Sequence, residues 1–464
     1  MTETGTAPSG IGAVGGGLHE LEALASAVAA QARAGEALEV YVSRGVETDI
    51  RAYEGEVESL SSAASAGIGI RVLVDGRQGF AYAGSLDEEV VRDTLAEARD
   101  NVAFATPDPH VGLATPDGVP RPAIDVWDDA VLTTSTADKV ALALELERRA
   151  RQIDPRVRTV SSADYGDIAA EAAIATSNGI VSSSRRTVCS LAADAIAGEG
   201  ADSQSGVGFS AGRGPGSLEL ERAAADAVER AVRMLGATKA RSGRVTVVFD
   251  PRVSSSLLAI VSSALSGESV TKGRSMFAGR IGEEVAAGQV TVVDDPTDVR
   301  AFGAAASDAE GLACRRNVLI ENGVLRGFVF DSTAARRFGT TSTASAVRGG
   351  YASGPIAGCR ALLLSPGALS GEEILAAVGD GLYVQSISGV HSGVNPVSGD
   401  FSVGAEGLVI RGGALAEPVR EVTIASTLQR MLQSLVHIGG DVEWLPGVAA
   451  GQTLAIEGMS LSGS

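Results

Sequence analysis

Apolar residues recur at helical spacing near the start of the chain and then give way to strand-like alternation. The first helical pattern runs from Leu18 to about Ala29. Two β-rich runs at 38–60 and 66–84 follow it, and Asp75-Gly76 inside the second run predicts a tight hairpin. An alternating segment at 159–200 is centred on a second turn signal, Asn178-Gly179. These patterns predict strand pairs accompanied by helices.

Three further segments of the first half have helical spacing, at about 85–103, 135–152 and 218–235, and Ser85 is the expected N-cap of the first of them. At Arg244 the pattern changes to a buried-type strand that ends at Pro251. A helical run follows, with Gly267 as its expected C-terminal stop, and then short β-runs separated by Gly, Asp and Pro. We therefore predict an α+β protein, with an N-terminal α/β-type domain of mixed sheet and flanking helices and a C-terminal β-rich domain.

The expected domain boundaries follow from these changes of pattern. Residues 1–17 have the composition of a disordered leader, and residues 18–240 form the N-terminal domain. Residues 106–122 contain five prolines and predict a linker or a long surface loop. Residues 241–464 form the C-terminal domain.

Composition narrows the classes of partner and the compartment. The net charge of −19 disfavours a nucleic-acid or anionic-membrane binder, because both of those partners are negatively charged. No stretch approaches the ~20 apolar residues of a membrane span. The three cysteines are far apart and form no CxxC pair, which is typical of a reducing compartment. We expect a cytoplasmic protein without a structural zinc site.

Familiar catalytic motifs are incomplete. Ser269 and Lys272 match the SxxK pattern of penicillin-recognising enzymes, but the companion KTG motif is missing. Asp294, Asp295 and Asp298 could in principle form a carboxylate metal site, although such a cluster after a strand more often makes Asx-type turns. Only four histidines occur, and no HExxH motif is present. The motifs by themselves identify no metal centre.

The loop from Gly389 to Phe401 is the densest group of polar candidates. Its sequence, GVHSGVNPVSGDF, offers four side chains with chemistry: His391, Ser392, Asn395 and Asp400. A Ser/His/Asp triad is one interpretation, but adjacent residues of an extended segment point to opposite faces. The alternative is a loop shaped by its glycines and proline, in which Asn and Asp bond to the backbone, and we favour this alternative.

The run that starts in this loop, GVHSGVNPVSGDFSVGAEG, resembles the TldD/PmbA family of peptidase-related proteins, in particular its PmbA (TldE) branch. Other segments agree in the same order, among them LLAIVSSALSGESVTKGRSMFAGRIGEEVAAGQVTVVDDPTD and EPVREVTIASTLQRMLQSLVHIGGDVEW. The resemblance is dense from about residue 245 to the end and weaker over 36–103.

The resemblance implies a partnership. Members of this family act as a heterodimer of a TldD-type and a TldE-type chain around an internal chamber. The TldD-type chain carries zinc on a helix with the motif HExxxH, together with a cysteine near its C-terminus. The pair cleaves unfolded or short peptides, including natural-product precursors, which enter as extended strands.

This chain departs from the zinc-binding branch at the positions that matter. Aligning the helical run after residue 249 places Leu258, Ala259 and Ser263 where the first His, the Glu and the second His would stand. A shift by one residue places Ala259, Ile260 and Ala264 there instead. None of these side chains can bind zinc or act as a base, and no cysteine lies near the C-terminus. We therefore expect no zinc and no catalytic residue in this chain.

The sequence thus predicts the non-zinc-binding subunit of a heterodimeric metallopeptidase, with zinc in a TldD-type partner and with neither nucleic acid nor membrane as a partner. We expect the β-rich domain to bind extended peptide at an accessible strand edge, with four side chains as polar contacts: His391, Ser392, Asn395 and Asp400. Two alternatives stay open. One is a stand-alone, metal-independent hydrolase of a specialised biosynthetic pathway, and the other is a pure scaffold or regulator of the partner.

Overall fold

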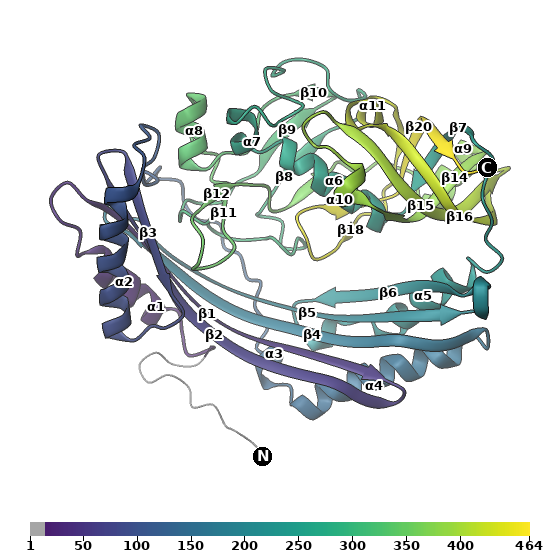
Figure 1. Cartoon of the computed structure of the whole chain (residues 1–464), viewed down its shortest axis with the longest axis horizontal. Helices are drawn as coiled ribbons and strands as arrows, with labels where there is room; N and C mark the ends of the chain where they lie inside the picture. The colour runs from purple at the N-terminus through teal and green to yellow at the C-terminus, as the bar shows by residue number, and fades with distance from the viewer. Residues whose placement is uncertain (1–13) are drawn as a thin grey trace.

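A computed structural model describes residues 14–464, and its first half is built on one long, curved, six-stranded sheet (Figure 1). The strand order is β3-β2-β1-β4-β5-β6. The strands are β1 (Ala37–Tyr53), β2 (Glu56–Val74), β3 (Arg77–Ala83), β4 (Val157–Thr176), β5 (Val181–Ala197) and β6 (Gln204–Gly212).

Every pairing in this sheet is antiparallel, so the expectation of a mixed sheet in this half is corrected, whereas the α+β class and the β-rich C-terminal region are confirmed. The reason lies in the turns. Asp75 and Gly76 both have positive φ and join β2 to β3, and Gly179 closes the β4–β5 hairpin. Short turns return the chain beside itself and therefore make β2 and β3, and likewise β4 and β5, antiparallel neighbours.

Helices cover only the convex face of the sheet, and the concave face is turned toward the C-terminal half (Figure 1). The alternation of buried and half-exposed positions along β4 follows from this arrangement, because side chains at every second position lie under the helices. Alanines dominate the layer between sheet and helices, for example Ala163 and Ala193 against Ala224 and Ala227. These small side chains let helix and sheet approach closely. The helices are α1 (His19–Ala29), α2 (Glu88–Asn101), α3 (Ala130–Thr133), α4 (Thr136–Ile153) and α5 (Leu220–Val232).

The predicted helices agree with these elements, with one correction at an N-terminus. Ser135 caps α4 by accepting a hydrogen bond from the N–H of Asp138. The expected cap of α2, Ser85, instead lies two residues before the true N-cap, Asp87. The Ser85 hydroxyl accepts from the Asp87 N–H at 3.1 Å and donates to its carboxylate at 3.0 Å, so it shapes the turn that precedes the helix.

The C-terminal half contains four sheets, of six, four, two and two strands, and several short helices around a large apolar core. Its larger elements are β7 (Gly243–Phe249), α6 (Pro251–Ala264), α9 (Gly371–Val378), β14 (Gly381–Ser388), β15 (Asp400–Arg411), β16 (Ala414–Thr427) and β20 (Leu454–Ser462). Its shorter helices are α7 (Gly267–Thr271), α8 (Ser332–Phe338), α10 (Val390–Gly393) and α11 (Leu428–Gln433). Its shorter strands are β8 (Val292–Asp294), β9 (Asn317–Glu321), β10 (Val324–Leu325), β11 (Ala346–Val347), β12 (Ile356–Ala357), β13 (Leu362–Leu364), β17 (Leu435–Ile438), β18 (Glu443–Trp444) and β19 (Ala450–Gly451).

The main C-terminal sheet closes on itself. Its order is β16-β15-β14-β7-β20-β17, and β16 also pairs with β20 through residues 423–425. This closure covers only these three residues of β16, because residues 414–422 pair with β15 alone apart from one bridge between Val419 and Thr238. The expected site for an extended peptide, an accessible edge in this sheet, stays a prediction for that stretch of β16. A second unpaired edge lies in the N-terminal sheet, where residues 56–67 of β2 pair only with β1.

The Pro-rich segment 106–122 is held by arginines of the C-terminal half. The guanidinium of Arg336 donates to the carbonyl oxygens of His110 at 2.6 Å, Gly112 at 2.6 Å and Leu113 at 3.2 Å. Arg337 pairs with Asp108, and Arg315 pairs with Asp117. Arg315, Arg336 and Arg337 therefore hold this segment against the C-terminal half.

The predicted leader lies mostly outside the described residues, which begin at residue 14. At its end, the Gly15 N–H donates to Glu171 and the Gly17 carbonyl accepts from Arg44. Among the described helices, none is long and apolar enough to cross a membrane.

Candidate functional site

Helix α6 occupies the place that the sequence comparison assigned to a zinc-binding helix. It begins directly after β7, with Asp250 as N-cap and Pro251 in the first turn. One carboxylate oxygen of Asp250 accepts from the Arg252 N–H at 2.9 Å. The other accepts from Arg230 at 2.5 Å and from the Tyr383 hydroxyl at 2.7 Å. Asp250 is 3% exposed, so this cluster fixes the start of α6 against α5 and β14.

The five positions of α6 that were aligned with the zinc motif carry only hydrocarbon and hydroxyl side chains, some buried and some facing outward. Leu258 and Ala264 are buried in the C-terminal core. Ala259 and Ile260 are half-buried, and Ser263 is exposed with its hydroxyl donating to the Ile260 carbonyl at 2.7 Å. Neither register of the comparison brings a nitrogen, thiolate or carboxylate ligand to this helix, so its residues do not fit a zinc ion. The expected C-terminal stop is corrected: α6 is capped at Leu265, and Gly267 opens α7.

The other candidate ligands are dispersed or engaged. Across residues 14–464, no group of three or more His, Cys, Asp or Glu side chains is placed to hold a metal ion. The three cysteines are buried, and burial raises the pKa of the Cys189 and Cys314 thiols to about 12. Asp295 and Asp298 accept backbone N–H groups two residues ahead of them, as the turn interpretation predicted, whereas the buried Asp294 accepts the N–H groups of Arg360 and Ala361. In the SxxK match, Lys272 pairs with Glu268.

The loop from Gly389 to Phe401 is a tightly bonded surface turn that contains α10. Gly389 opens it in the left-handed region at φ 75°, where glycine is favoured. The Asn395 side-chain oxygen accepts from the N–H groups of Val397 at 2.9 Å and Ser398 at 3.2 Å. The backbone closes the turn through a 2.9 Å hydrogen bond from the Asn395 N–H to the Asp400 carbonyl.

The four predicted contact residues of this loop, His391, Ser392, Asn395 and Asp400, are all exposed. Their side chains form no common constellation. The Ser392 hydroxyl donates to the Gly389 carbonyl at 3.3 Å, and an Asp400 carboxylate oxygen accepts from Ser398 at 2.7 Å. The hydrogen bonds of this loop therefore link Ser392 neither to His391 nor to Asp400, and a triad is not assembled in this conformation.

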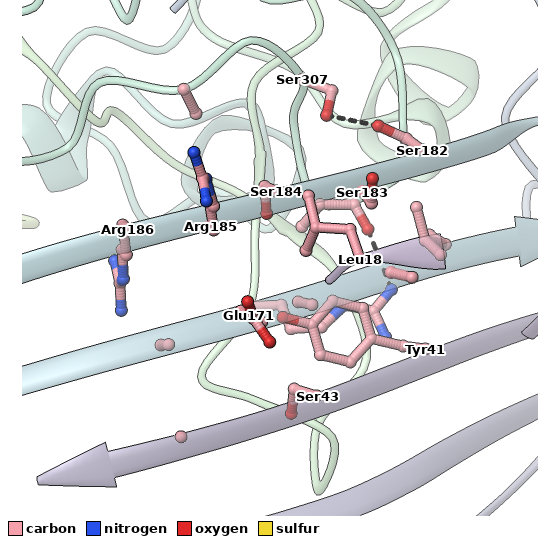
Figure 2. Close-up of a pocket in the computed structure, with 18 of the residues that line it drawn as sticks. Leu18, Tyr41, Ser43, Glu171, Ser182, Ser183, Ser184, Arg185, Arg186 and Ser307 are labelled. Carbon is pink, nitrogen blue, oxygen red and sulfur yellow. Dashed lines mark hydrogen bonds between the residues drawn. The ribbon is translucent and has the colours of Figure 1, made fainter. Parts of the chain in front are cut away.

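A cavity of about 610 Å³ lies where the concave face of the N-terminal sheet meets the C-terminal half (Figure 2). Its floor is formed by small residues of the three central strands, including Gly45, Ala170 and Ala172. Its walls come from two C-terminal segments, residues 304–309 and 348–351, together with Arg360. Ser182 and Ser307 join floor and wall through a 2.7 Å hydrogen bond. The volume is that of a typical ligand pocket.

One edge of the cavity is set by a close backbone approach. Tyr351 lies over two glycines of β2: a Cβ on Gly67 would lie 2.5 Å from its ring, and one on Gly69 would lie 2.1 Å from its carbonyl oxygen. Only glycine fits under such a contact. The short Gly67-Ile-Gly69 pattern of the sequence therefore serves packing between the two halves.

Behind this wall lies a buried charged network that sequence reasoning missed. Glu39 receives Arg71 at 2.8 Å and Arg348 at 2.6 Å. Burial alone raises the pKa of Glu39, but the attraction of both arginines outweighs it and lowers that pKa. Nearby, burial raises the pKa of Asp308 to about 6, and burial together with Asp308 raises the pKa of Glu310 to about 8. The signal in the sequence is weak, because Glu39, Arg71 and Arg348 lie in separate segments.

Family models of known proteins match three successive segments of this chain between residues 38 and 463. Three family models match: PmbA/TldA metallopeptidase domain 1 at 38–102, the central domain at 130–235 and the C-terminal domain at 242–463. The chain is 27% identical over 445 residues to the metalloprotease PmbA of Escherichia coli O157:H7, covering 95% of this chain and 96% of that protein.

A second relative and a solved structure extend this similarity. The chain is 27% identical over 391 residues to the metalloprotease TldD homolog of Haemophilus influenzae, covering 81% of this chain and 80% of that protein. TldE from Thermococcus kodakarensis has a TM-score of 0.85 at 24% identity, covering 92% of this chain and 97% of that chain. The likeness to this structure supports the fold.

Proposed function

This chain belongs to the PmbA/TldA metallopeptidase family, and on that premise we propose that it is the non-zinc-binding subunit of a heterodimeric peptidase. Its partner in this proposal is a TldD-type chain that carries the zinc ion, and the substrate is an unfolded or short peptide in the cytoplasm. Zinc bound in the partner supplies an activated water for peptide hydrolysis. The present chain supplies surface, position and substrate contacts.

The single observation that carries this proposal is the chemistry of α6. The helix is anchored by the buried Asp250 cluster and packed into the core by Leu257, Leu258 and Val261. It offers alkyl groups and serine hydroxyls where a zinc-binding relative needs two imidazoles and a general base. A subunit whose partner performs the chemistry needs this helix for its structure but does not need zinc ligands on it. The anchored, ligand-free α6 fits such a subunit.

The concave face of the N-terminal sheet supports a role in accommodating peptide. Across its centre, Ser61, Asp49, Gly166 and Ser190 lie side by side in register and on one face. Apart from Asp49 these residues are small, and they leave Gly166 half-exposed instead of buried under another layer. A floor of small residues lets a second backbone approach closely, which suits an extended peptide of varied sequence.

The test is reconstitution with a TldD-type chain that contains HExxxH. We expect the two chains to co-purify, the pair to cleave an unstructured peptide, and a chelator to abolish that cleavage while the present chain alone is inactive. Cleavage by this chain alone in the presence of chelator would instead support the stand-alone hydrolase. Full turnover by the partner alone, once stabilised, would support the scaffold.

The loop residues are tested in the assembled pair. We propose that His391, Ser392, Asn395 and Asp400 contact the substrate or the partner. Combined alanine substitution of His391, Asn395 and Asp400 is expected to raise KM or weaken assembly. Unchanged peptide turnover together with unchanged assembly would remove these residues from the site.

A further inference from the structure

The cavity floor carries an arginine, Arg186, whose charge is not compensated by any neighbour among residues 14–464. Ser65, Gly45, Ala170 and Arg186 form a row across β2, β1, β4 and β5. Because residues directly opposite each other in an antiparallel sheet share a face, all four side chains point to the concave side. Ser182, four residues earlier on β5, has the same orientation and bonds to Ser307. Arg186 therefore stands on the face that the C-terminal segments partly cover.

Within the described residues 14–464, Arg186 makes no hydrogen bond and no ion pair, and its side chain is exposed. Its neighbour Arg185 points the opposite way (Figure 2) and lies over the Trp127 ring at 5.1 Å. A second arginine, Arg213, lies close enough to Arg186 to feel its charge. Burial lowers the pKa of Arg213, and repulsion by the like charge of Arg186 lowers it further. Arg213 itself is held by the carbonyl oxygens of Thr187 and Ala301.

The C-terminal wall adds two arginines with unused donors. Arg348 and Arg360 both line the cavity, and the buried Nε–H group of each has no acceptor among the described residues. Arg348 is otherwise engaged, because it donates to Glu39 at 2.6 Å and stacks over Tyr41 at 4.5 Å. Arg360 donates to the Ala346 carbonyl at 3.3 Å. Such buried donors require an acceptor, either water or a ligand.

The carboxylates of the cavity wall are already occupied. Glu171 pairs with Arg44 at 2.6 Å. Asp308 accepts three backbone N–H groups, and Asp125 accepts the Trp127 N–H at 3.3 Å. In a chain of net charge −19, Arg186 is thus a positive charge in this cavity that pairs with no carboxylate of the described residues.

We propose that the cavity binds a carboxylate of an extended peptide, with Arg186 as its direct contact. This inference rests on the proposed function, which makes a peptide the substrate. A guanidinium offers two parallel N–H donors that match the two oxygens of a carboxylate. The small residues beside Arg186 leave room for the peptide backbone that carries the carboxylate, and the hydroxyls of Ser43, Ser65 and Ser184 line the same space. The contact would set the register of the peptide in the chamber.

The experiment compares three fluorescently labelled forms of one short unstructured peptide: a free C-terminal carboxylate, a C-terminal amide, and the amide with one internal glutamate. Binding is measured by anisotropy, both with the purified chain and with the assembled pair. The variants are Arg186→Gln and, as the charge-matched control, Arg158→Gln, which removes an exposed arginine of β4 that pairs with Glu199.

We expect the wild-type chain to bind the free carboxylate about tenfold more tightly than the amide, the scale of one charge-assisted hydrogen bond. Arg186→Gln should abolish this preference and leave affinity for the amide unchanged, whereas Arg158→Gln should behave as wild type. Recovered affinity in the glutamate form would identify a side-chain carboxylate as the ligand, and its absence would identify the C-terminus.

Two results would overturn the inference. Equal affinity of the wild type for the carboxylate and amide forms would mean that the unused donors bind only water, and a carboxylate preference retained by Arg186→Gln would place the anion elsewhere. Either result leaves the proposed function standing, because peptide still binds. Failure of both preparations to bind any of the three peptides contradicts the proposed function and this inference together.

Discussion

Replacing Asp250 by alanine should be among the most damaging single changes near α6. The carboxylate caps the helix at one oxygen and receives Arg230 and Tyr383 at the other. Loss of an N-cap costs about 1 kcal/mol. Removing one partner of a buried ion pair costs about 3–5 kcal/mol, because the remaining charge stays buried.

The lower end of that range applies to Asp250, because Arg230 keeps 16% of its side-chain surface exposed and retains a 3.3 Å hydrogen bond to the Gln385 carbonyl. We therefore expect Asp250→Ala to lower the free energy of unfolding by about 4 kcal/mol. Asp250→Asn keeps a capping oxygen but loses the charge. Its free energy of unfolding should therefore lie between those of the wild type and Asp250→Ala. Urea unfolding followed by tryptophan fluorescence measures both variants, since Trp444 reports on the C-terminal half.

Two further variants separate the capping role of Asp250 from its charge pairing with Arg230. Ser135→Ala removes the N-cap of α4 without breaking an ion pair and should cost only about 1 kcal/mol. Arg230→Met combined with Asp250→Ala should be less damaging than the sum of the single changes, because no unpaired charge remains. If Asp250→Ala costs no more than Ser135→Ala, the polar cluster contributes nothing beyond capping and the argument is refuted.

Three smaller predictions concern pH, close packing and the polar loop. Burial and Asp308 raise the pKa of Glu310 to about 8 from its ordinary 4.5, so the folded state keeps a proton that the unfolded chain releases, and stability falls as pH rises through that window. Glu310→Gln should reduce this loss of stability, measured as the change in the urea midpoint between the ordinary pKa of 4.5 and the raised pKa of about 8. A change in midpoint equal to that of the wild type would contradict the prediction. Gly69→Ala places a Cβ 2.1 Å from a carbonyl oxygen and should cost about 1–3 kcal/mol in urea unfolding, whereas Gly216→Ala, which meets no atom within 4 Å, should be nearly neutral. Asn395→Ala removes the acceptor of two backbone N–H groups, so hydrogen exchange should accelerate at residues 397 and 398 and nowhere in the sheet, and exchange rates equal to wild type would show that the side chain does not hold the loop.

The sequence by itself determined the local structure and the lack of ligands on one helix. Turn dipeptides such as Asp75-Gly76 require backbone angles that few other residues adopt, and helical spacing placed the start of α4 within one residue of its observed start at Thr136. Because zinc needs imidazole, thiolate or carboxylate ligands, the side chains at 258, 259 and 263 were informative without coordinates.

Only the tertiary structure decided which distant residues meet. The antiparallel order of the six strands, the closure of β16 onto β20 and the cavity between the halves depend on contacts between segments far apart in the chain. Arg186 looks like half of an ordinary surface pair in the sequence. Strand register turns it toward the concave face while Arg185 points the opposite way, and the positions of the carboxylates leave its charge without a partner among the described residues. Such facts arise from the balance of packing and desolvation over the whole molecule, which local sequence patterns do not record.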